Sequence, residues 1–402
     1  MGRVVLVLLA AHILSMLGSQ TFAALLPELR GEWAMTNAQA GVVGGMFFAG
    51  YIATVSYWTA LTDRVDARKV YLAGGLLAAA GGAGFGLAAS GFYSAIFFQM
   101  LLGVGVAATY MPGLRILSEH ISGPTQSRSI AFYTSFFGIG TALSLAIAGA
   151  VAPLAGWPAA FIVSAAGPLS AGLLVFFLIE RKEAAKAKTA FTWSTLFPVA
   201  AWRKVLAIRA AFGYTAGYFA HCLELFGSRA WMVAFLAFSS GLHAGGSFPW
   251  QLPAIAAVVN LASVPASIIG NEIALRMGRR RWITMAMAGS GATGILLGFS
   301  APWYWGLVLA ILMLYAVLVM AESATLTAGL IAAAPAELRG AAMGLYSLVG
   351  FAGGMLGPMV YGVALDTAGG AGSAGAWIAG YAAIGTGCLL APLVVRISRP
   401  KS

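Results

Sequence analysis

The sequence predicts an all-α membrane protein with 12 transmembrane helices in two pseudo-symmetric six-helix bundles and cytoplasmic termini. Three observations support this fold class. Hydrophobic residues make up 60% of the 402 positions and charged residues only 9%, and the mean hydropathy of +0.88 lies far above that of soluble domains. Apolar stretches long enough to cross a bilayer recur along the chain. Positively charged residues gather in alternate loops between them.

A spanning helix needs roughly 20 mostly apolar residues. Six such stretches precede a polar break, at residues 4–27, 40–62, 69–90, 93–117, 128–152 and 158–179. Six more follow it, at residues 209–236, 250–274, 282–300, 304–330, 341–365 and 375–396. The predicted domains are therefore an N-terminal bundle (1–180), a cytoplasmic linker (181–208) and a C-terminal bundle (209–402).

The net charge of +11 indicates topology rather than nucleic-acid binding. With a cytoplasmic N-terminus, 20 of the 23 Lys and Arg residues fall in inner loops and tails, where such residues are enriched. The pattern places Arg30 and Arg229 near the outer face and Arg115 within a helix. We expect a monomeric, multi-pass protein of a bacterial-type inner (plasma) membrane, in contact with the lipid bilayer and with no nucleic-acid partner.

Two segments leave alternatives open. The first apolar run follows Arg3 as in a signal peptide, but it is about 23 residues long and eleven spans follow, which favours a retained helix. Within the linker, residues 191–202 are amphipathic enough to lie along the inner membrane surface. A simple tether is equally compatible with this composition.

Similar loops stand at matching places in the two halves. Residues 62–69 (TDRVDARK) follow the second predicted helix, and residues 274–281 (ALRMGRRR) follow the eighth. Residues 124–129 and 335–340 follow the fourth and tenth in the same way. Repeated halves are typical of transporters whose solute site lies near the membrane midplane.

The loop after the second helix resembles the signature of the major facilitator superfamily. The matching residues are Asp63, Arg64, Arg68 and Lys69, while Thr59 and Asp66 stand where glycines are usual. In the second half the matching residues are Arg276, Gly278, Arg279 and Arg280, and Leu275 takes the acidic position. The resemblance extends over essentially the whole chain. It implies that these loops help to set a cytoplasmic gate, with positive-inside anchoring as the alternative.

Two departures from the family pattern argue against a drug exporter. Many members carry an arginine four residues before a glycine in the fourth helix, where this chain has Gln99 before Gly103. The fifth helix has Gly138, Gly140 and Gly149 without the Gly-Pro-x-x-Gly-Gly pattern of drug and proton antiporters.

Ionisable residues within the predicted spans are few and regularly placed. They are His12 in the first span, Arg115 in the fourth, His221 and Glu224 in the seventh, and Glu322 in the tenth. Such groups are costly at membrane depth and are rarely retained unless they line a water-filled path or find a partner. This placement predicts one helix in every three facing a shared polar pathway. The family resemblance implies the same four helices around the central cavity.

Helix seven is expected to carry a proton-binding pair. Polar side chains share one of its faces, at Tyr214, Tyr218, His221, Glu224 and Ser228. His221 and Glu224 lie one turn apart, so the carboxylate can hold the imidazole or bias its protonation. The alternative is that the two only satisfy each other, or Arg229, as structural contacts.

Helices one, four, five and ten supply the other candidates. Tyr315 and Glu322 share a face of helix ten, followed by Ser323, and Arg115 either meets Glu322 as an inner gate or extends to the headgroups. His12 is either a packing or gating contact or a ligand. Gln20, Tyr110 and Tyr133 are placed as solute contacts by position, and packing is the alternative for the two aromatic residues.

No enzyme constellation is present in the sequence. There is no glycine-rich phosphate loop with lysine, which argues against ATP-driven transport. The four His residues lack ligand spacing, and Cys222 and Cys388 are expected to be small hydrophobic residues, so we expect neither a metal site nor a cofactor.

The expected function is secondary transport of a small solute by alternating access, driven by protons or by a counter-solute. Arg115 and His12 would make the cavity partly cationic, which favours a small organic or inorganic anion. Export of amphipathic, drug-like compounds is the alternative, and a non-transporting sensor or scaffold is a further one.

Overall fold

The structure, a computed structural model, describes residues 2–121, 124–182, 192–242 and 248–390. All regular secondary structure within these ranges is helical, as the apolar stretches predict. The chain forms two compact units. Unit 1 comprises Met1–Leu25 and Met46–Phe197, and unit 2 comprises Leu26–Gly45 and Pro198–Ser402. The domain boundaries predicted from the sequence stay a prediction.

The helices of unit 1 are α1 (Arg3–Ser15), the start of α2 (Thr21–Glu32), most of α3 (Asn37–Leu61), α4 (Ala67–Ala88), α5 (Phe92–His120), α6 (Pro124–Leu178) and α7 (Trp193–Leu196). Unit 2 contains the end of α2 and the start of α3. It continues with α8 (Val199–Ala207), α9 (Arg209–Gly241), α10 (Leu252–Met277), α11 (Arg279–Phe299), α12 (Trp305–Ala321), α13 (Ser323–Ala333), the short 3₁₀ helix η1 (Ala336–Leu338), α14 (Arg339–Thr367) and α15 (Ala374–Leu389).

Nine helical stretches of the described residues are long and apolar enough to cross a membrane. One of them, Phe132–Leu178, has 47 residues and leaves the helical conformation at Gly156, between two predicted spans. α1 and α15 are apolar but shorter. An all-helical, multi-pass membrane protein is thus confirmed. The count of 12, the pseudo-symmetry and the side of the termini stay predictions, and residues 391–396 of the last predicted span lie outside the described ranges.

The first predicted span is interrupted rather than continuous. α1 ends at Ser15 and α2 begins at Thr21, with Gly18 at a φ of 98° between them. The Ser144 hydroxyl of α6 accepts the backbone N–H groups of Gly18 (3.1 Å) and Gln20 (3.0 Å). Irregular backbone at membrane depth needs partners inside the protein. Ser144 supplies them, and Gln20 belongs to this break.

The tenth predicted span is also interrupted. α12 ends at Ala321 and α13 begins at Ser323, which leaves Glu322 in the break. The indole N–H of Trp282 donates to the Ala321 carbonyl (3.0 Å), and the hydroxyl of Ser267 accepts the Ala324 N–H (3.2 Å). Side chains of α11 and α10 therefore satisfy the backbone on both sides of Glu322.

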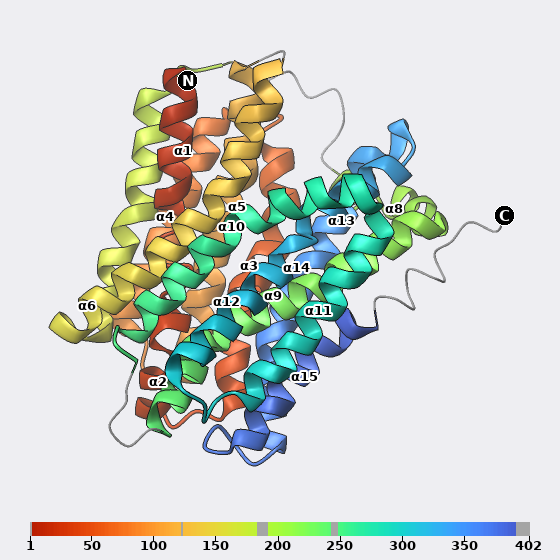
Figure 1. Ribbon diagram of the computed structural model, residues 1–402. Coiled ribbons are helices and arrows are strands. Elements are labelled where there is room, and N and C mark those ends of the chain that lie inside the picture. The colour runs from red at the N-terminus through yellow and green to blue at the C-terminus, as the bar shows by residue number, and fades with distance from the viewer. Residues whose placement is uncertain (1, 122–123, 183–191, 243–247, 391–402) are drawn as a thin grey trace. The chain divides into compact units, whose positions relative to one another are not determined.

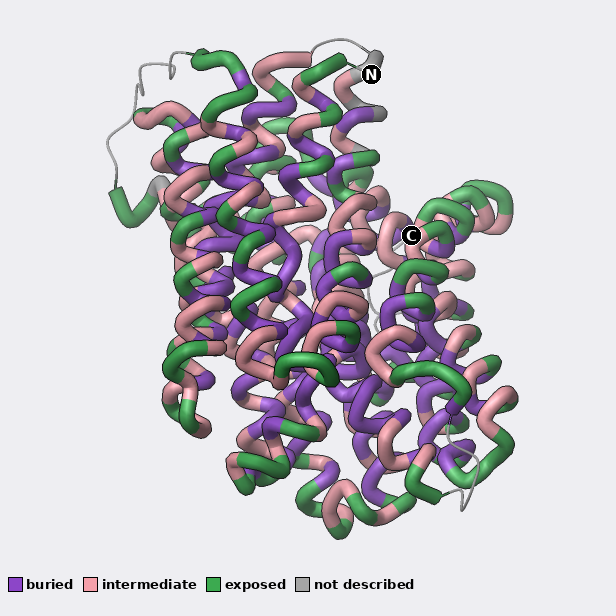
Figure 2. The backbone as a smooth tube through the Cα atoms, turned by 90° about the vertical axis from the view of Figure 1, so that its left-hand side faces the viewer, coloured by how far each residue is buried: buried purple, intermediate pink, exposed green. Residues whose placement is uncertain are grey.

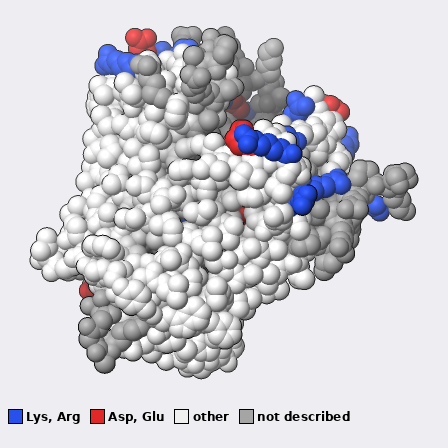
Figure 3. Space-filling view, in the orientation of Figure 1, with Lys and Arg blue, Asp and Glu red and all other residues white. Residues whose placement is uncertain are grey.

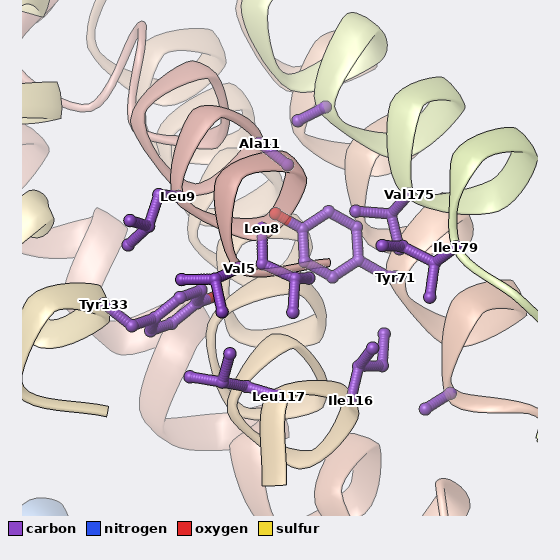
Figure 4. Close-up of a cluster of buried hydrophobic side chains, with 12 residues drawn as sticks. Val5, Leu8, Leu9, Ala11, Tyr71, Ile116, Leu117, Tyr133, Val175 and Ile179 are labelled. Atoms are coloured by element: carbon purple, nitrogen blue, oxygen red, sulfur yellow. The ribbon is translucent and has the colours of Figure 1, made fainter. Parts of the chain in front are cut away.

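The core of unit 1 is built from four helices. α1 lies beside α6, and Leu8 of α1 is fully buried near Tyr71 of α4 (Figure 1 and Figure 4). Ile116 of α5 and Val175 of α6 complete this part of the cluster. Their burial holds α1 in place along the side chains of α4, α5 and α6.

Close helix packing dominates unit 2. Gly353 and Gly357 of α14 lie so near α9 that an added Cβ would collide with the backbone at Phe219 or Leu223. Such contacts are typical of membrane helices, which approach through small residues. In the linker, α8 packs against α9 and α14 through the fully buried Val205, so this segment is anchored to unit 2.

The surface is consistent with lipid contact. Figure 2 shows buried and exposed residues alternating along most helices, so that one side of each faces protein. On the face shown in Figure 3, wide areas carry no Lys, Arg, Asp or Glu. Charged side chains are costly in contact with lipid, and their scarcity there is expected of spanning helices.

Candidate functional site

Unit 2 holds a buried imidazole–carboxylate pair. Nδ1 of His221 on α9 lies 2.9 Å from Oε1 of Glu322, in the break between α12 and α13. The two side chains are 1% and 0% exposed. An imidazole and a carboxylate in hydrogen-bond contact share a proton and can accept or release another. The pair is therefore able to carry a proton within the apolar part of the protein.

Stacked tyrosines fix the orientation of this imidazole. The Tyr218 ring lies nearly parallel to His221, with centroids 5.7 Å apart. Tyr346 of α14 stacks on Tyr218 at 3.8 Å, and its hydroxyl lies 3.1 Å from Oγ1 of Thr327. The sequence pattern did not single out Tyr346, because nothing in a lone tyrosine of an apolar helix marks it as a neighbour of Tyr218.

Glu224 has a different partner from the one expected. The Ser290 hydroxyl of α11 donates to Oε2 of Glu224 (2.7 Å), whereas His221 pairs with Glu322. Each glutamate also keeps one oxygen, Oε1 of Glu224 and Oε2 of Glu322, without a hydrogen-bond partner among the described residues. Two buried carboxylates thus retain the capacity to accept a proton or a hydrogen bond.

The other predicted residues of unit 2 lie near these groups or pack elsewhere. Tyr214 packs its ring against Gly329 of α13, where an added Cβ would strike it. Tyr315 is buried and meets Tyr381 edge to face at 5.7 Å. Ser323 follows Glu322 directly and begins α13.

Arg229 is buried within α9. It is on α9, 12 residues before the last residue of that helix, which corresponds to about 18 Å. Its exposure is only 6%. The seventh span is predicted to end near residue 236, and α9 extends to Gly241. The location of Arg229 near the outer face stays a prediction.

In unit 1, three predicted residues come together. His12 of α1 is fully buried and stacks on Tyr133 of α6, with centroids 4.2 Å apart and planes 19° from parallel. Tyr110 of α5 is tilted against the same imidazole at 5.3 Å. Neither ring nitrogen of His12 has a hydrogen-bond partner among the described residues. The site is an aromatic enclosure around one polar group.

Arg115 is neutralised within unit 1. Its guanidinium pairs with Glu119 (2.7 Å) and with Asp63, and it also donates to the Thr62 hydroxyl (3.2 Å). These contacts join α5 to the loop that follows α3. With two carboxylates beside it, Arg115 offers little positive charge to an anionic solute. This removes one of the two residues on which the expectation of a cationic cavity rested.

The two loops of the family signature are ordered by different means. In the first, Arg64 lies close to the Asp63–Arg115 pair in sequence, and Arg68 binds Asp66. In the second, Gly278 joins α10 to α11 with a φ of 95°, a conformation that favours glycine. Arg276 is exposed and Arg279 begins α11.

Asp66, which replaces a usual glycine, caps a helix. Its carboxylate accepts the Arg68 backbone N–H (3.0 Å) as the N-cap of α4 and pairs with the Arg68 guanidinium (2.7 Å). Arg68 also donates to the Ile179 carbonyl just after α6 (2.8 Å). The pair therefore ties the start of α4 to the end of α6.

Asp66→Ala is expected to lower the free energy of unfolding by about 1–2 kcal/mol through loss of the cap. Burial raises the pKa of the Asp66 carboxyl, but hydrogen bonds and positive charge from Arg68 outweigh it and set the pKa below its ordinary value. The stabilisation is then present above the unfolded-state pKa and is lost as pH falls through the folded-state pKa. The difference in thermal stability between wild type and Asp66→Asn should shrink below about pH 4. A difference that stays constant into acid would contradict this role.

Among the described residues, no group of three or more His, Cys, Asp or Glu side chains is placed to hold a metal ion.

The family model of the Major Facilitator Superfamily matches residues 8–358. The chain belongs to this superfamily. The structure of the nucleoside transporter NupG, solved as a mutant, superposes on this superfamily member with a TM-score of 0.80 at 14% identity, covering 98% of this chain and 100% of that one. This likeness shows the fold alone.

Two curated relatives are transporters by name. The niacin transporter NiaP of Acinetobacter baylyi is 25% identical over 37% of this chain and 33% of its own length. A protein of Oryza sativa subsp. japonica, named "Probable inorganic phosphate transporter 1-9", is 31% identical over 38% of this chain and 29% of its own length. This superfamily member thus matches about a third or less of each relative. The family and these relatives are transporters and not enzymes.

Proposed function

We propose that this superfamily member is a proton-coupled secondary transporter that moves a small anion by alternating access. The observation that carries the proposal is the buried His221–Glu322 pair, with Glu224 one turn along α9 from His221. Ionisable groups at membrane depth are retained chiefly where they serve a solute or proton path. Glu322 with His221 is the proposed proton carrier, and Glu224 is a second protonatable group near it.

An anionic solute is supported by the solutes named for two relatives. Niacin is a pyridine carboxylate and inorganic phosphate is an oxyanion, so the solutes named for both relatives are negatively charged at neutral pH. Arg115 is neutralised by Asp63 and Glu119. The anion must then be attracted by other cationic groups, of which Arg229 is the buried one in unit 2.

Other predicted residues receive proposed roles from their surroundings or from the family resemblance. His12, Tyr110 and Tyr133 would contact the apolar part of the solute, since aromatic rings surround the single imidazole. Asp63, Arg64, Arg68, Arg276, Gly278 and Arg279 would belong to a cytoplasmic gate. The cytoplasmic location of this gate assumes the proposed topology of 12 spans in two pseudo-symmetric bundles with cytoplasmic termini. The proposed membrane is a bacterial-type inner membrane, and the proposed working unit is a monomer.

Purified protein in proteoliposomes is expected to accumulate radiolabelled nicotinate or inorganic phosphate when an inward proton gradient is imposed. A protonophore should abolish accumulation, because the gradient supplies the energy. Empty liposomes and the uncharged analogue nicotinamide are the controls. Uptake of either anion that ignores the gradient would contradict proton coupling, and preferential uptake of nicotinamide would contradict anion selectivity.

A further inference from the structure

Arg229 is a guanidinium buried without an opposing charge. Arg229 lies within α9, 12 residues before its last residue, and is 6% exposed. Among the residues that the structure describes, the hydrogen bond recorded for it is from NH2 to the Met320 sulfur, at 3.8 Å. A thioether sulfur is a weak acceptor. No described carboxylate forms an ion pair with Arg229.

The two acidic residues that are buried in the described part of unit 2 have other partners. Glu322 binds His221 at 2.9 Å, and Glu224 binds the Ser290 hydroxyl at 2.7 Å. A buried charge is normally paired, since removing it from water is unfavourable unless other groups compensate. Arg229 lacks this compensation in the protein alone. A ligand of opposite charge would supply it.

The Arg229 side chain lies away from the face of α9 that packs closely on α14. Gly227 packs against Gly357 of α14. Arg229 follows two residues later, which places its side chain about 160° around the helix from Gly227. There it meets Met320, near the end of α12 and two residues before Glu322. The guanidinium thus lies beside the interrupted helix that carries the proposed proton site.

We propose that the Arg229 guanidinium binds the anionic group of the transported solute, and that this group is an oxyanion, either a carboxylate or a phosphate. The planar fork of arginine donates two parallel N–H bonds to such a group. Met320 is a flexible apolar neighbour that fits varied solute bodies. This inference rests on the proposed function in that it names the residue and the chemical group that the transporter recognises.

Equilibrium binding to the full-length protein in detergent tests the assignment. Wild type is expected to bind nicotinate, inorganic phosphate or both in titration calorimetry, and to bind uncharged nicotinamide more weakly. Which anion binds distinguishes a carboxylate from a phosphate solute. Arg229→Gln should weaken binding by about tenfold to a hundredfold, with Arg229→Lys in between because it keeps the charge without the fork. Arg209→Gln, an exposed arginine of the same helix, is the matched control and should bind as wild type.

A second variant separates binding from folding. Arg229→Met removes the charge and keeps a long side chain, so without ligand it should raise the melting temperature. A purely structural guanidinium would give the opposite shift. The inference is overturned if wild type binds neither oxyanion, if Arg229→Gln binds them as tightly as wild type, or if Arg229→Met melts below wild type. Binding needs no proton gradient, so protein that binds but fails to accumulate the anion contradicts the proposed function and leaves this inference standing.

Discussion

Glu322→Gln is expected to reduce accumulation of the solute under a proton gradient to the level of empty liposomes. Glutamine has nearly the same shape and its amide oxygen can still accept a hydrogen bond from His221, so the fold should persist. An amide does not gain or lose a proton in the physiological range, and the cycle of proton binding and release would stop. Exchange of labelled for unlabelled solute, which needs no net proton movement, should survive. The two measurements in the same liposomes separate coupling from solute binding.

Variants of two further glutamates serve as comparisons for Glu322→Gln. Glu272→Gln changes an exposed carboxylate of α10 and should leave accumulation unaltered. Glu224→Gln changes a buried carboxylate whose partner, the Ser290 hydroxyl, can also donate to an amide oxygen. Loss of accumulation in Glu224→Gln would extend the proton path to this group. If Glu322→Gln retains the wild-type response to the gradient, Glu322 is not the proton carrier.

Composition and hydropathy were sufficient to predict the helical membrane class, because both depend on the sum over many residues. Composition and hydropathy did not predict the two helix breaks, between α1 and α2 and between α12 and α13. Residues 16–20 and Glu322 lie within apolar stretches that predict continuous helices, and the partners that allow each break are distant in sequence. Ser144 holds the first break, and Trp282 and Ser267 hold the second. A local pattern carries no information about such partners.

The candidate site, too, could be predicted from the sequence only in part. Helical periodicity identified His221, Glu224 and Glu322 as buried polar groups, but it paired His221 with its neighbour in sequence. In the structure the pair forms between α9 and the break after α12. α9 also extends to Gly241, beyond the predicted end of the seventh span. Periodicity gives the face of one helix, whereas partners depend on how helices pack.

Gly41→Leu is expected to destabilise unit 2 by about 1–3 kcal/mol. Gly41 lies near the start of α3, and a Cβ added there would collide with the Pro358 carbonyl of α14. Backbone cannot move aside as a flexible side chain can, so the effect should fall in the upper part of this range. Asp366 of α14 holds the same contact by accepting the N–H groups of Asn37 (3.1 Å) and Ala38 (2.8 Å). Hydrogen exchange of residues 37–45 should accelerate when the two helices are forced apart.

Gly31→Leu is the matched control, because nothing lies within 4 Å of a Cβ built at Gly31 and the residue belongs to the same segment of unit 2. It should exchange and melt as wild type. α3 continues from unit 2 into unit 1, so loosening its first turns should also change the transport rate. A Gly41→Leu protein with wild-type exchange at residues 37–45 would mean that α3 does not pack on α14 at this point. A Gly31→Leu protein with equally fast exchange would attribute the effect to the added leucine rather than to the lost contact.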